Sequence, residues 1–106
     1  MKTDVLTDLI ATIKTRKGAD PASSWTAKLL SEGMPRCAKK FGEEAVEAAL
    51  AAVSGDKAHL TAEAADVLYH LLVMLEAGDV AFADVLVELE NRQSRSGIAE
   101  KAARKG

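Results

Sequence analysis

Acidic residues recur at helical spacing in two neighbouring segments of this 106-residue sequence. The first segment carries Glu43, Glu44 and Glu47, and the second carries Glu63 and Asp66. Residues three or four apart lie on one face of an α-helix, so Glu44 shares a face with Glu47, and Glu63 shares one with Asp66. Carboxylates gathered on two adjacent helices provide the oxygen ligands that a divalent cation prefers.

The rest of the second segment is apolar around almost its whole circumference: Leu60, Val67, Leu68, Leu71, Leu72, Val73, Met74 and Leu75. A helix of this kind is expected to be buried, and a buried carboxylate must be paired, protonated or bound to a metal. The same faces offer only Lys40, and His70 if it is charged, as partners for the acids. We therefore predict a Mg²⁺ site, because like charges so close together need a divalent ion to neutralise them. Its predicted ligands are Glu44, Glu47, Glu63 and Asp66.

The neighbouring acid Glu43 lies about 100° around the helix from Glu44. Three roles stay open for it: a group that orients the ligands without binding the ion, a further ligand at the edge of the site, or a solvated surface group. The ordinary alternative for all these acids is a charged outer face, which fits the second segment poorly because that helix has little other charge. A transition-metal site is disfavoured, because Glu-x-x-His pairs and the H-E-x-x-H motif are absent. His70 lies on the acidic face and can instead hydrogen-bond a carboxylate, whereas His59 is expected to be exposed.

Cations that could hold phosphate lie near the acidic segments and in the basic tail: Lys28, Arg36, Lys39, Lys40, Arg92, Arg95 and Lys101. Each alone is typical of a solvated charge. Lys40 differs from the others because it lies one turn from Glu44 on the same face. The glycine-rich phosphate loops G-x-x-x-x-G-K-[ST] and G-x-G-x-x-G are absent, so any polyphosphate chemistry is expected to depend on the metal.

Hydrophobic periodicity predicts an all-α fold of four to five helices. The expected elements are a first helix capped by Thr3 and ending before Gly18, then Trp25–Ser31, Met34–Ser54, Lys57–Ala77, and a fifth helix after Gly78-Asp79. The short turn at Gly55 predicts that the third and fourth helices pack antiparallel, with their acidic faces opposed. No linker or repeat divides the chain, so residues 1–106 are expected to form one domain with a tail from about residue 93.

The composition fits a small, soluble helical protein of the cytoplasm. Hydrophobic residues make up 48% of the chain but aromatic residues only 4%, and the net charge of −2 gives no case for nucleic acid binding. The single cysteine, Cys37, excludes an internal disulfide, and neither a signal peptide nor a membrane span is expected. The fourth helix has more apolar surface than one small chain can cover. This excess predicts a homodimer that completes a helical bundle.

The acidic pattern E-x-x-E, a spacer of fifteen residues and E-x-x-D resembles that of the MazG-like all-α nucleotide pyrophosphohydrolases, which hold Mg²⁺ between helices. Longer pieces resemble one branch of these enzymes, the phosphoribosyl-ATP pyrophosphohydrolases of histidine biosynthesis. The pieces are SWTAKLL (24–30), KKFGEEAVE (39–47), EAADVLYHLLV (63–73) and RSGIAEK (95–101). One departure is Trp25, where the family pattern leads us to expect Tyr.

The resemblance implies Mg²⁺-dependent hydrolysis of phosphoribosyl-ATP to phosphoribosyl-AMP and pyrophosphate, the second step of histidine synthesis. It implies catalytic roles for Glu43, Glu44 and Glu47. The substrate contacts that it implies are Lys28, Lys40, Tyr69, His70, Arg95 and Lys101. Two alternatives stay open: a general nucleoside triphosphate pyrophosphohydrolase with the same metal site, and a non-catalytic helical dimerisation module.

Overall fold

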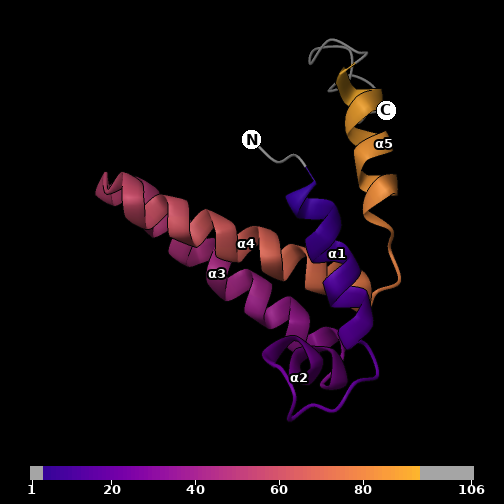
Figure 1. The fold of residues 1–106 in the computed structure, drawn as a ribbon. Coiled ribbons are helices and arrows are strands. Elements are labelled where there is room, and N and C mark those ends of the chain that lie inside the picture. The colour runs from indigo at the N-terminus through magenta and orange to yellow at the C-terminus, as the bar shows by residue number, and fades with distance from the viewer. Residues whose placement is uncertain (1–3, 94–106) are drawn as a thin grey trace.

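A computed structural model describes residues 4–93 of the chain, and these residues form helices and turns without a strand. The helices are α1 (Val5–Arg16), α2 (Trp25–Ser31), α3 (Met34–Ser54), α4 (Lys57–Ala77) and α5 (Phe82–Gln93) (Figure 1). The predicted all-α fold is therefore confirmed, and the predicted bounds of α2, α3 and α4 agree with the structure. The predicted cap of α1 was wrong by one residue, because Asp4 precedes the first helical residue and makes no side-chain cap.

Local signals in the sequence set where the central helices begin and end. The Ser24 hydroxyl accepts a 3.0 Å hydrogen bond from the Ala27 amide at the start of α2. The Asp56 carboxylate accepts a similar bond from the His59 amide at the start of α4. Between α3 and α4, Gly55 adopts a left-handed conformation with φ of 81°, which favours glycine because other residues are strained there. The end of α3 at Gly55 and the start of α4 at Asp56 are thus adjacent, and a tight turn joins the two longest helices.

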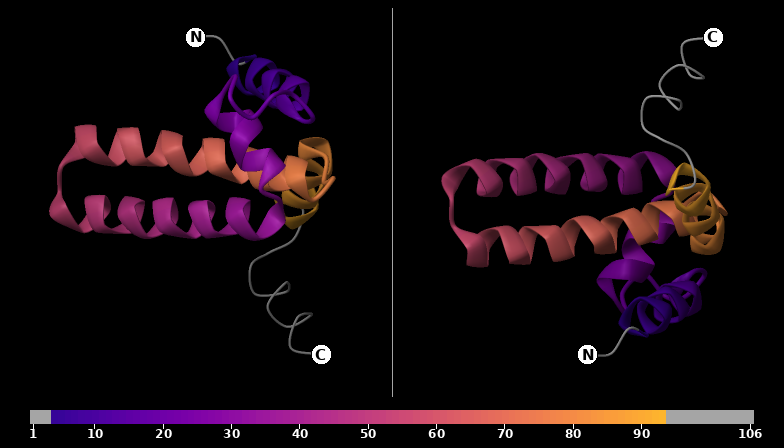
Figure 2. Two further views of the ribbon diagram at one scale, coloured as in Figure 1. Left: turned by 90° about the horizontal axis from the view of Figure 1, so that it is seen from below. Right: turned by 90° about the horizontal axis from the view of Figure 1, so that it is seen from above.

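Helices α3 and α4, each of 21 residues, form a long antiparallel hairpin. Figures 1 and 2 show that the turn at Gly55 lies at the free end of the hairpin, far from α1 and α2. The other helices gather at the opposite end, where α3 begins and α4 ends. The middle of the hairpin, which carries the acidic residues, is therefore formed by α3 and α4 alone.

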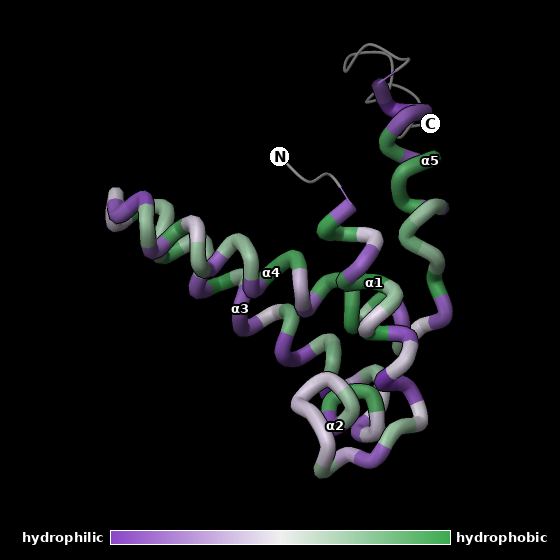
Figure 3. The backbone as a smooth tube through the Cα atoms, viewed as in Figure 1, coloured by the Kyte–Doolittle hydropathy of each residue, from purple (hydrophilic) through white to green (hydrophobic). Residues whose placement is uncertain are grey.

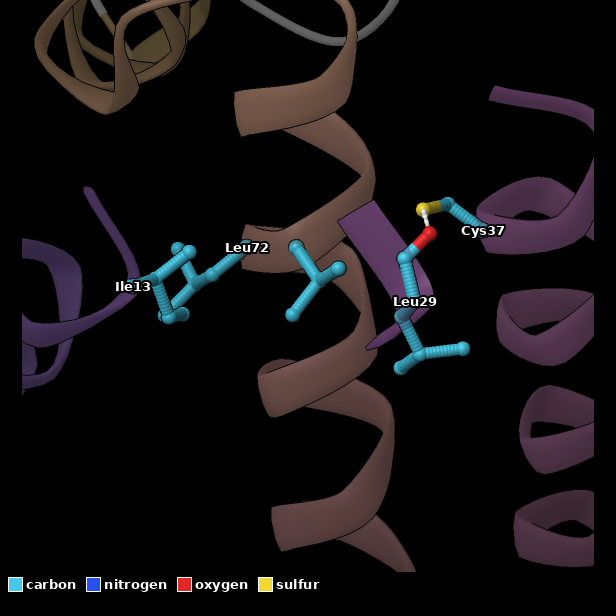
Figure 4. Packing of buried hydrophobic residues seen from close by; sticks show 5 residues of the cluster. Ile13, Leu29, Cys37 and Leu72 are labelled. Atoms are coloured by element: carbon cyan, nitrogen blue, oxygen red, sulfur yellow. Dashed lines mark hydrogen bonds between the residues drawn. The ribbon is translucent and has the colours of Figure 1, made fainter. Parts of the chain in front are cut away.

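The hydrophobic core lies at the end of the hairpin where α1 and α2 pack. Its buried members come from four helices: Ile13, Leu29, Cys37, Leu72 and Val73. Figure 4 shows Ile13 beside Leu72 on one side of α4 and Leu29 beside Cys37 on the other, where the Cys37 thiol donates to the Leu29 carbonyl oxygen at 3.4 Å. Gly78 lies so close to Met34 that a Cβ there would be 2.6 Å from the Met34 methyl carbon. The small residue at the end of α4 lets the start of α3 pack against it.

Charged groups fasten the end of α1 to the end of α4. The Lys17 ammonium lies 2.7 Å from the Asp79 carboxylate and donates to the Glu76 carbonyl oxygen at 3.1 Å. Pairing with Asp79 raises the pKa of Lys17, and the same pair lowers the pKa of Asp79. The Glu76 carboxylate also pairs with Lys14 at 3.2 Å. These contacts hold α1 over the core rather than over the acidic residues.

The expectation that α4 is buried along its length was wrong for this single chain. Its buried residues, His70, Leu72 and Val73, all lie in the second half. Large apolar side chains on the free half of the hairpin are exposed, namely Val46, Leu50, Val53 and Leu60, and so is Leu68 just past the middle of α4. The exposure follows from the architecture, because α1, α2 and α5 lie at the other end of the hairpin (Figures 1 and 2). Figure 3 shows hydrophobic segments continuing along both helices beyond the region that the other helices cover.

Helix α5 also leaves apolar surface open, and no residue within its described range is buried. Between α1, α4 and α5 lies an apolar groove of about 340 Å³, bordered by Ile10, Leu75, Phe82 and Leu86. Its two charged lining residues, Lys14 and Glu76, pair with each other. The groove holds none of the predicted site residues. Within residues 4–93, no helix has the length and apolar character that crossing a membrane requires.

Candidate metal and substrate site

The antiparallel hairpin places the acidic residues opposite one another in two levels. Glu47 lies eight residues before Gly55 and Glu63 lies eight residues after it. Glu44 and Asp66 lie eleven residues before and after the same glycine. Since the two helices have the same rise per residue, equal separation from the turn brings each pair to the same height. The E-x-x-E and E-x-x-D patterns are thus matched in register.

We call the four facing acids, Glu44, Glu47, Glu63 and Asp66, the acidic cluster. One carboxylate oxygen from each of Glu44, Glu63 and Asp66 lies within 4.8 Å of the other two. Glu44 and Glu63 are half-buried, and Asp66 is exposed at the open side. The three carboxylates are therefore partly shielded from solvent at Glu44 and Glu63 and accessible to solvent at Asp66.

Glu47 completes the acidic cluster. Its pKa is raised, chiefly by the negative charge of Glu44, then by that of Glu63, then by desolvation, and also by hydrogen bonding to those two carboxylates. A raised pKa means that ionised Glu47 is disfavoured where it stands. The four predicted ligands thus occupy one locality in which negative charge is in excess.

Few cations offset that charge. Lys40 lies 3.6 Å from Glu44 and 3.5 Å from Glu43, and His59 lies 3.4 Å from Glu63. Among the described residues, no other Lys, Arg or His lies within 4.0 Å of a carboxylate oxygen of the cluster. The second oxygen of Glu63, Oε2, is buried and makes no hydrogen bond. A buried carboxylate oxygen without a partner is costly, so this atom is well suited to a bound cation.

The geometry fits a small hard cation. Ligand oxygens bind Mg²⁺ at about 2.1 Å, so two oxygens on opposite sides of the ion lie about 4.2 Å apart. The carboxylate oxygens of Glu44, Glu63 and Asp66 lie within 4.8 Å of one another, close to that value, and the side chains can rotate to make up the difference. All four groups are carboxylates, the ligand type that Mg²⁺ prefers over nitrogen and sulfur.

Two predicted site residues lie beside the acidic cluster without joining it. The Lys40 side chain is 21% exposed, and its ammonium lies near both Glu43 and Glu44, as the one-turn spacing from Glu44 predicted. Glu43 is exposed and has Lys40 as its ion-pair partner. It is therefore next to the cluster and open to solvent, and all three roles considered for it stay open.

His70 is buried rather than open to the acidic face. Its Nδ1 lies 2.8 Å from the backbone carbonyl oxygen of Asp66, so this nitrogen is the donor. The other ring nitrogen, Nε2, is buried and has no hydrogen-bond partner. The adjacent Tyr69 packs edge-on against the His70 ring and shares a hydrogen bond with the Thr26 hydroxyl of α2. Both residues therefore support the segment that carries Asp66.

The remaining predicted contacts are less close to the cluster. Lys28 is exposed on α2, with its ammonium 6.0 Å from the centre of the Trp25 ring. Among the other cations considered, Arg36 pairs with Glu32, and Arg92 pairs with Glu88. Arg95 and Lys101 lie outside the described residues. His59 is exposed, as predicted, and it also lies 3.4 Å from Glu63, a contact that we did not predict although the two residues are one turn apart on the same face.

Comparison with known proteins agrees with this arrangement of helices and acids. The sequence profile of the phosphoribosyl-ATP pyrophosphohydrolase family matches residues 6–93. A protein of Dinoroseobacter shibae named phosphoribosyl-ATP pyrophosphatase is 70% identical over 100 residues, which are 94% of this chain and 98% of that protein. A protein of Ruegeria pomeroyi with the same name is 68% identical over 100 residues, 94% of this chain and 95% of the relative. The chain therefore belongs to the phosphoribosyl-ATP pyrophosphohydrolase family.

Proposed function

We propose that this chain hydrolyses phosphoribosyl-ATP to phosphoribosyl-AMP and pyrophosphate, and that it does so with Mg²⁺; its relatives are named phosphoribosyl-ATP pyrophosphatases. Glu44, Glu47, Glu63 and Asp66 would hold the ion. The observation that carries the metal assignment is the excess of converging carboxylates, one of them with a buried oxygen that has no hydrogen bond. This reaction is the second step of histidine biosynthesis.

Bound Mg²⁺ would supply positive charge to the phosphate oxygens and to the leaving pyrophosphate. In the reaction, water oxygen forms a bond to the α-phosphorus while the bond from that phosphorus to the bridging oxygen breaks. Glu43 is exposed beside the cluster and is our candidate to accept the proton of the attacking water. Its pairing with Lys40 would hold the carboxylate in place.

Lys40 has a second use in this proposal. Its ammonium lies within 4 Å of both Glu43 and Glu44, at the edge of the acidic cluster. A triphosphate that enters the site brings negative charge to the same edge, and an ammonium there can pair with the β- or γ-phosphate. Arg95 and Lys101 of the tail stay predictions for the same task.

We also propose that two copies of the chain associate through the free half of the hairpin. Val46, Leu50 and Val53 repeat at helical spacing on the side of α3 opposite Glu44, and Val53 is 83% exposed. Leu60 and Leu68 of α4 are exposed as well. Several large apolar side chains exposed on so small a protein favour an interaction site, and a two-fold partner with the same surface would cover them.

The substrate is tested by comparing pyrophosphate release from phosphoribosyl-ATP with release from ordinary deoxynucleoside triphosphates, at equal enzyme and Mg²⁺ concentrations. We expect kcat/KM to be at least a hundredfold higher for phosphoribosyl-ATP. Equal rates on both would favour a general nucleoside triphosphate pyrophosphohydrolase instead.

The metal site is tested by Glu44→Gln, which keeps the size of the side chain and removes one negative charge. Turnover should be lost while the helical circular dichroism spectrum stays the same. Wild-type activity in this variant would remove Glu44 from the site. A non-catalytic dimerisation module would show neither hydrolysis nor stabilisation by Mg²⁺ in thermal melts.

A further inference from the structure

The only tryptophan of the chain is exposed next to the helix that carries Asp66. Trp25 is the first residue of α2 and is 45% exposed, whereas Ala27 and Leu29 of the same helix are fully buried. The Lys28 ammonium lies 6.0 Å from the centre of the Trp25 ring, at the outer limit of a cation–π contact. Lys28 forms no ion pair with any described carboxylate. One flat aromatic surface and one available positive charge therefore stand side by side.

Hydrogen bonds fix this pair relative to the acidic cluster. The Ser24 hydroxyl caps α2, and the hydroxyls of Thr26 and Tyr69 are hydrogen-bonded across to α4. Tyr69 lies three residues after Asp66, which is less than one turn along α4. The Thr26–Tyr69 hydrogen bond therefore links the start of α2, where Trp25 lies, to the turn of α4 that carries Asp66.

We propose that the Trp25 ring stacks on the purine of phosphoribosyl-ATP. We also propose that Lys28 pairs with the phosphate of the second ribose, the one that does not carry the triphosphate. The inference rests on the proposed function and names the residues that would recognise the end of the substrate away from the reacting phosphates. A triphosphate bound at the cluster leaves its base free to reach one side of α4, and the tie through Tyr69 places the aromatic surface on that helix. Base stacking needs only an exposed π-face, and Lys28 adds a contact that a nucleotide without the second ribose phosphate cannot make.

The position of the only tryptophan makes binding directly observable. The product phosphoribosyl-AMP, which is not hydrolysed further here, should quench the intrinsic fluorescence in a saturable way. AMP should quench it with roughly tenfold weaker affinity, because it lacks the phosphate assigned to Lys28. A second copy of the chain covering Trp25 would give the opposite pattern, a spectrum that changes with protein concentration and ignores both nucleotides. That pattern would overturn the inference.

Two substitutions at position 25 separate stacking from bulk. Trp25→Leu removes the aromatic surface and should raise KM for phosphoribosyl-ATP about tenfold with kcat within twofold, whereas Trp25→Phe should restore most of the loss. Lys28→Gln should raise KM for phosphoribosyl-ATP and leave KM for ATP unchanged. Circular dichroism of each variant checks that the fold is kept. Wild-type KM values in Trp25→Leu would refute the stacking role while leaving the reaction established, and an inactive wild type would instead refute the proposed function.

Discussion

Replacing one acid of the cluster by its amide should stabilise the metal-free protein and remove its activity. Glu63→Gln is the best choice, because the Glu63 side chain is only 15% exposed and one of its oxygens is buried without a partner. The substitution keeps the shape of the side chain, removes a negative charge beside Glu44 and Asp66, and offers an amide that can donate to them.

The expected size of the effect follows from the distances. Two unit charges 4.8 Å apart repel by about 0.9 kcal/mol even at the dielectric constant of water, so the repulsions of Glu63 with Glu44 and with Asp66, which Glu63→Gln removes, amount to about 2 kcal/mol. The substitution also weakens the contact with His59, and an exposed pair of that kind contributes about 0 to 1 kcal/mol. A net gain of about 1 kcal/mol in a domain of this size corresponds to a rise in Tm of about 5 °C.

The assay is a thermal melt in EDTA at fixed protein concentration, with Glu76→Gln as the control. Glu76 lies on the same helix with similar exposure, 13%, but it pairs with Lys14 at 3.2 Å and Lys17 at 3.6 Å. The same substitution should therefore lower Tm at position 76 and raise it at position 63. Mg²⁺ should stabilise the wild type and not Glu63→Gln, whose kcat should fall at least about a hundredfold. A Tm for Glu63→Gln at or below that of the wild type in EDTA would refute the reasoning, because the acids would then not be in uncompensated repulsion.

Three further predictions concern pH, the core and assembly. Because the pKa of Glu47 is raised in the fold, its contribution to the stability of the metal-free protein is present below the unfolded pKa and is lost as pH rises through the folded pKa. Thermal melts in EDTA from about pH 4 to about pH 7 should therefore show a loss of stability that Glu47→Gln abolishes. Identical pH profiles for the two proteins would contradict this. Leu29→Ala should cost about 2 to 5 kcal/mol in urea unfolding because Leu29 is fully buried, whereas Val5→Ala at an exposed site should change stability by less than about 0.5 kcal/mol. Leu50→Lys should convert a dimer to monomers in sedimentation experiments; a monomeric wild type would refute the proposed association.

Much of the fold could be predicted because the sequence marks its helix ends clearly. Ser24 and Asp56 cap the helices that follow them, and Gly55 forms the predicted turn, so each acts within one turn of its own position. The facing of the two acidic pairs follows from the same short turn, since positions equally far from Gly55 must lie opposite one another. These features depend on local interactions, which a pattern of residues records directly.

Other features depend on which surfaces meet, and the sequence pattern does not record them. The apolar circumference of α4 predicted burial, yet in one chain only its second half is covered by α1 and α2. His70 shares the acidic line, but its ring bonds to the Asp66 carbonyl oxygen rather than facing the cluster. The exposed position of Trp25 beside Lys28 likewise depends on how α2 packs against α4.

The central claim is that the carboxylates of the hairpin hold Mg²⁺ for cleavage of phosphoribosyl-ATP. The most direct test measures pyrophosphate release from phosphoribosyl-ATP as free Mg²⁺ is titrated from zero, in the wild type and in Asp66→Asn. Asp66 is exposed and belongs to the cluster, so its amide should change binding of the ion without disturbing the core. We expect no release without Mg²⁺, saturable activation of the wild type, and activation of Asp66→Asn only at much higher Mg²⁺ with a reduced maximum. Release that is independent of Mg²⁺, or the same activation curve for both proteins, would contradict the claim.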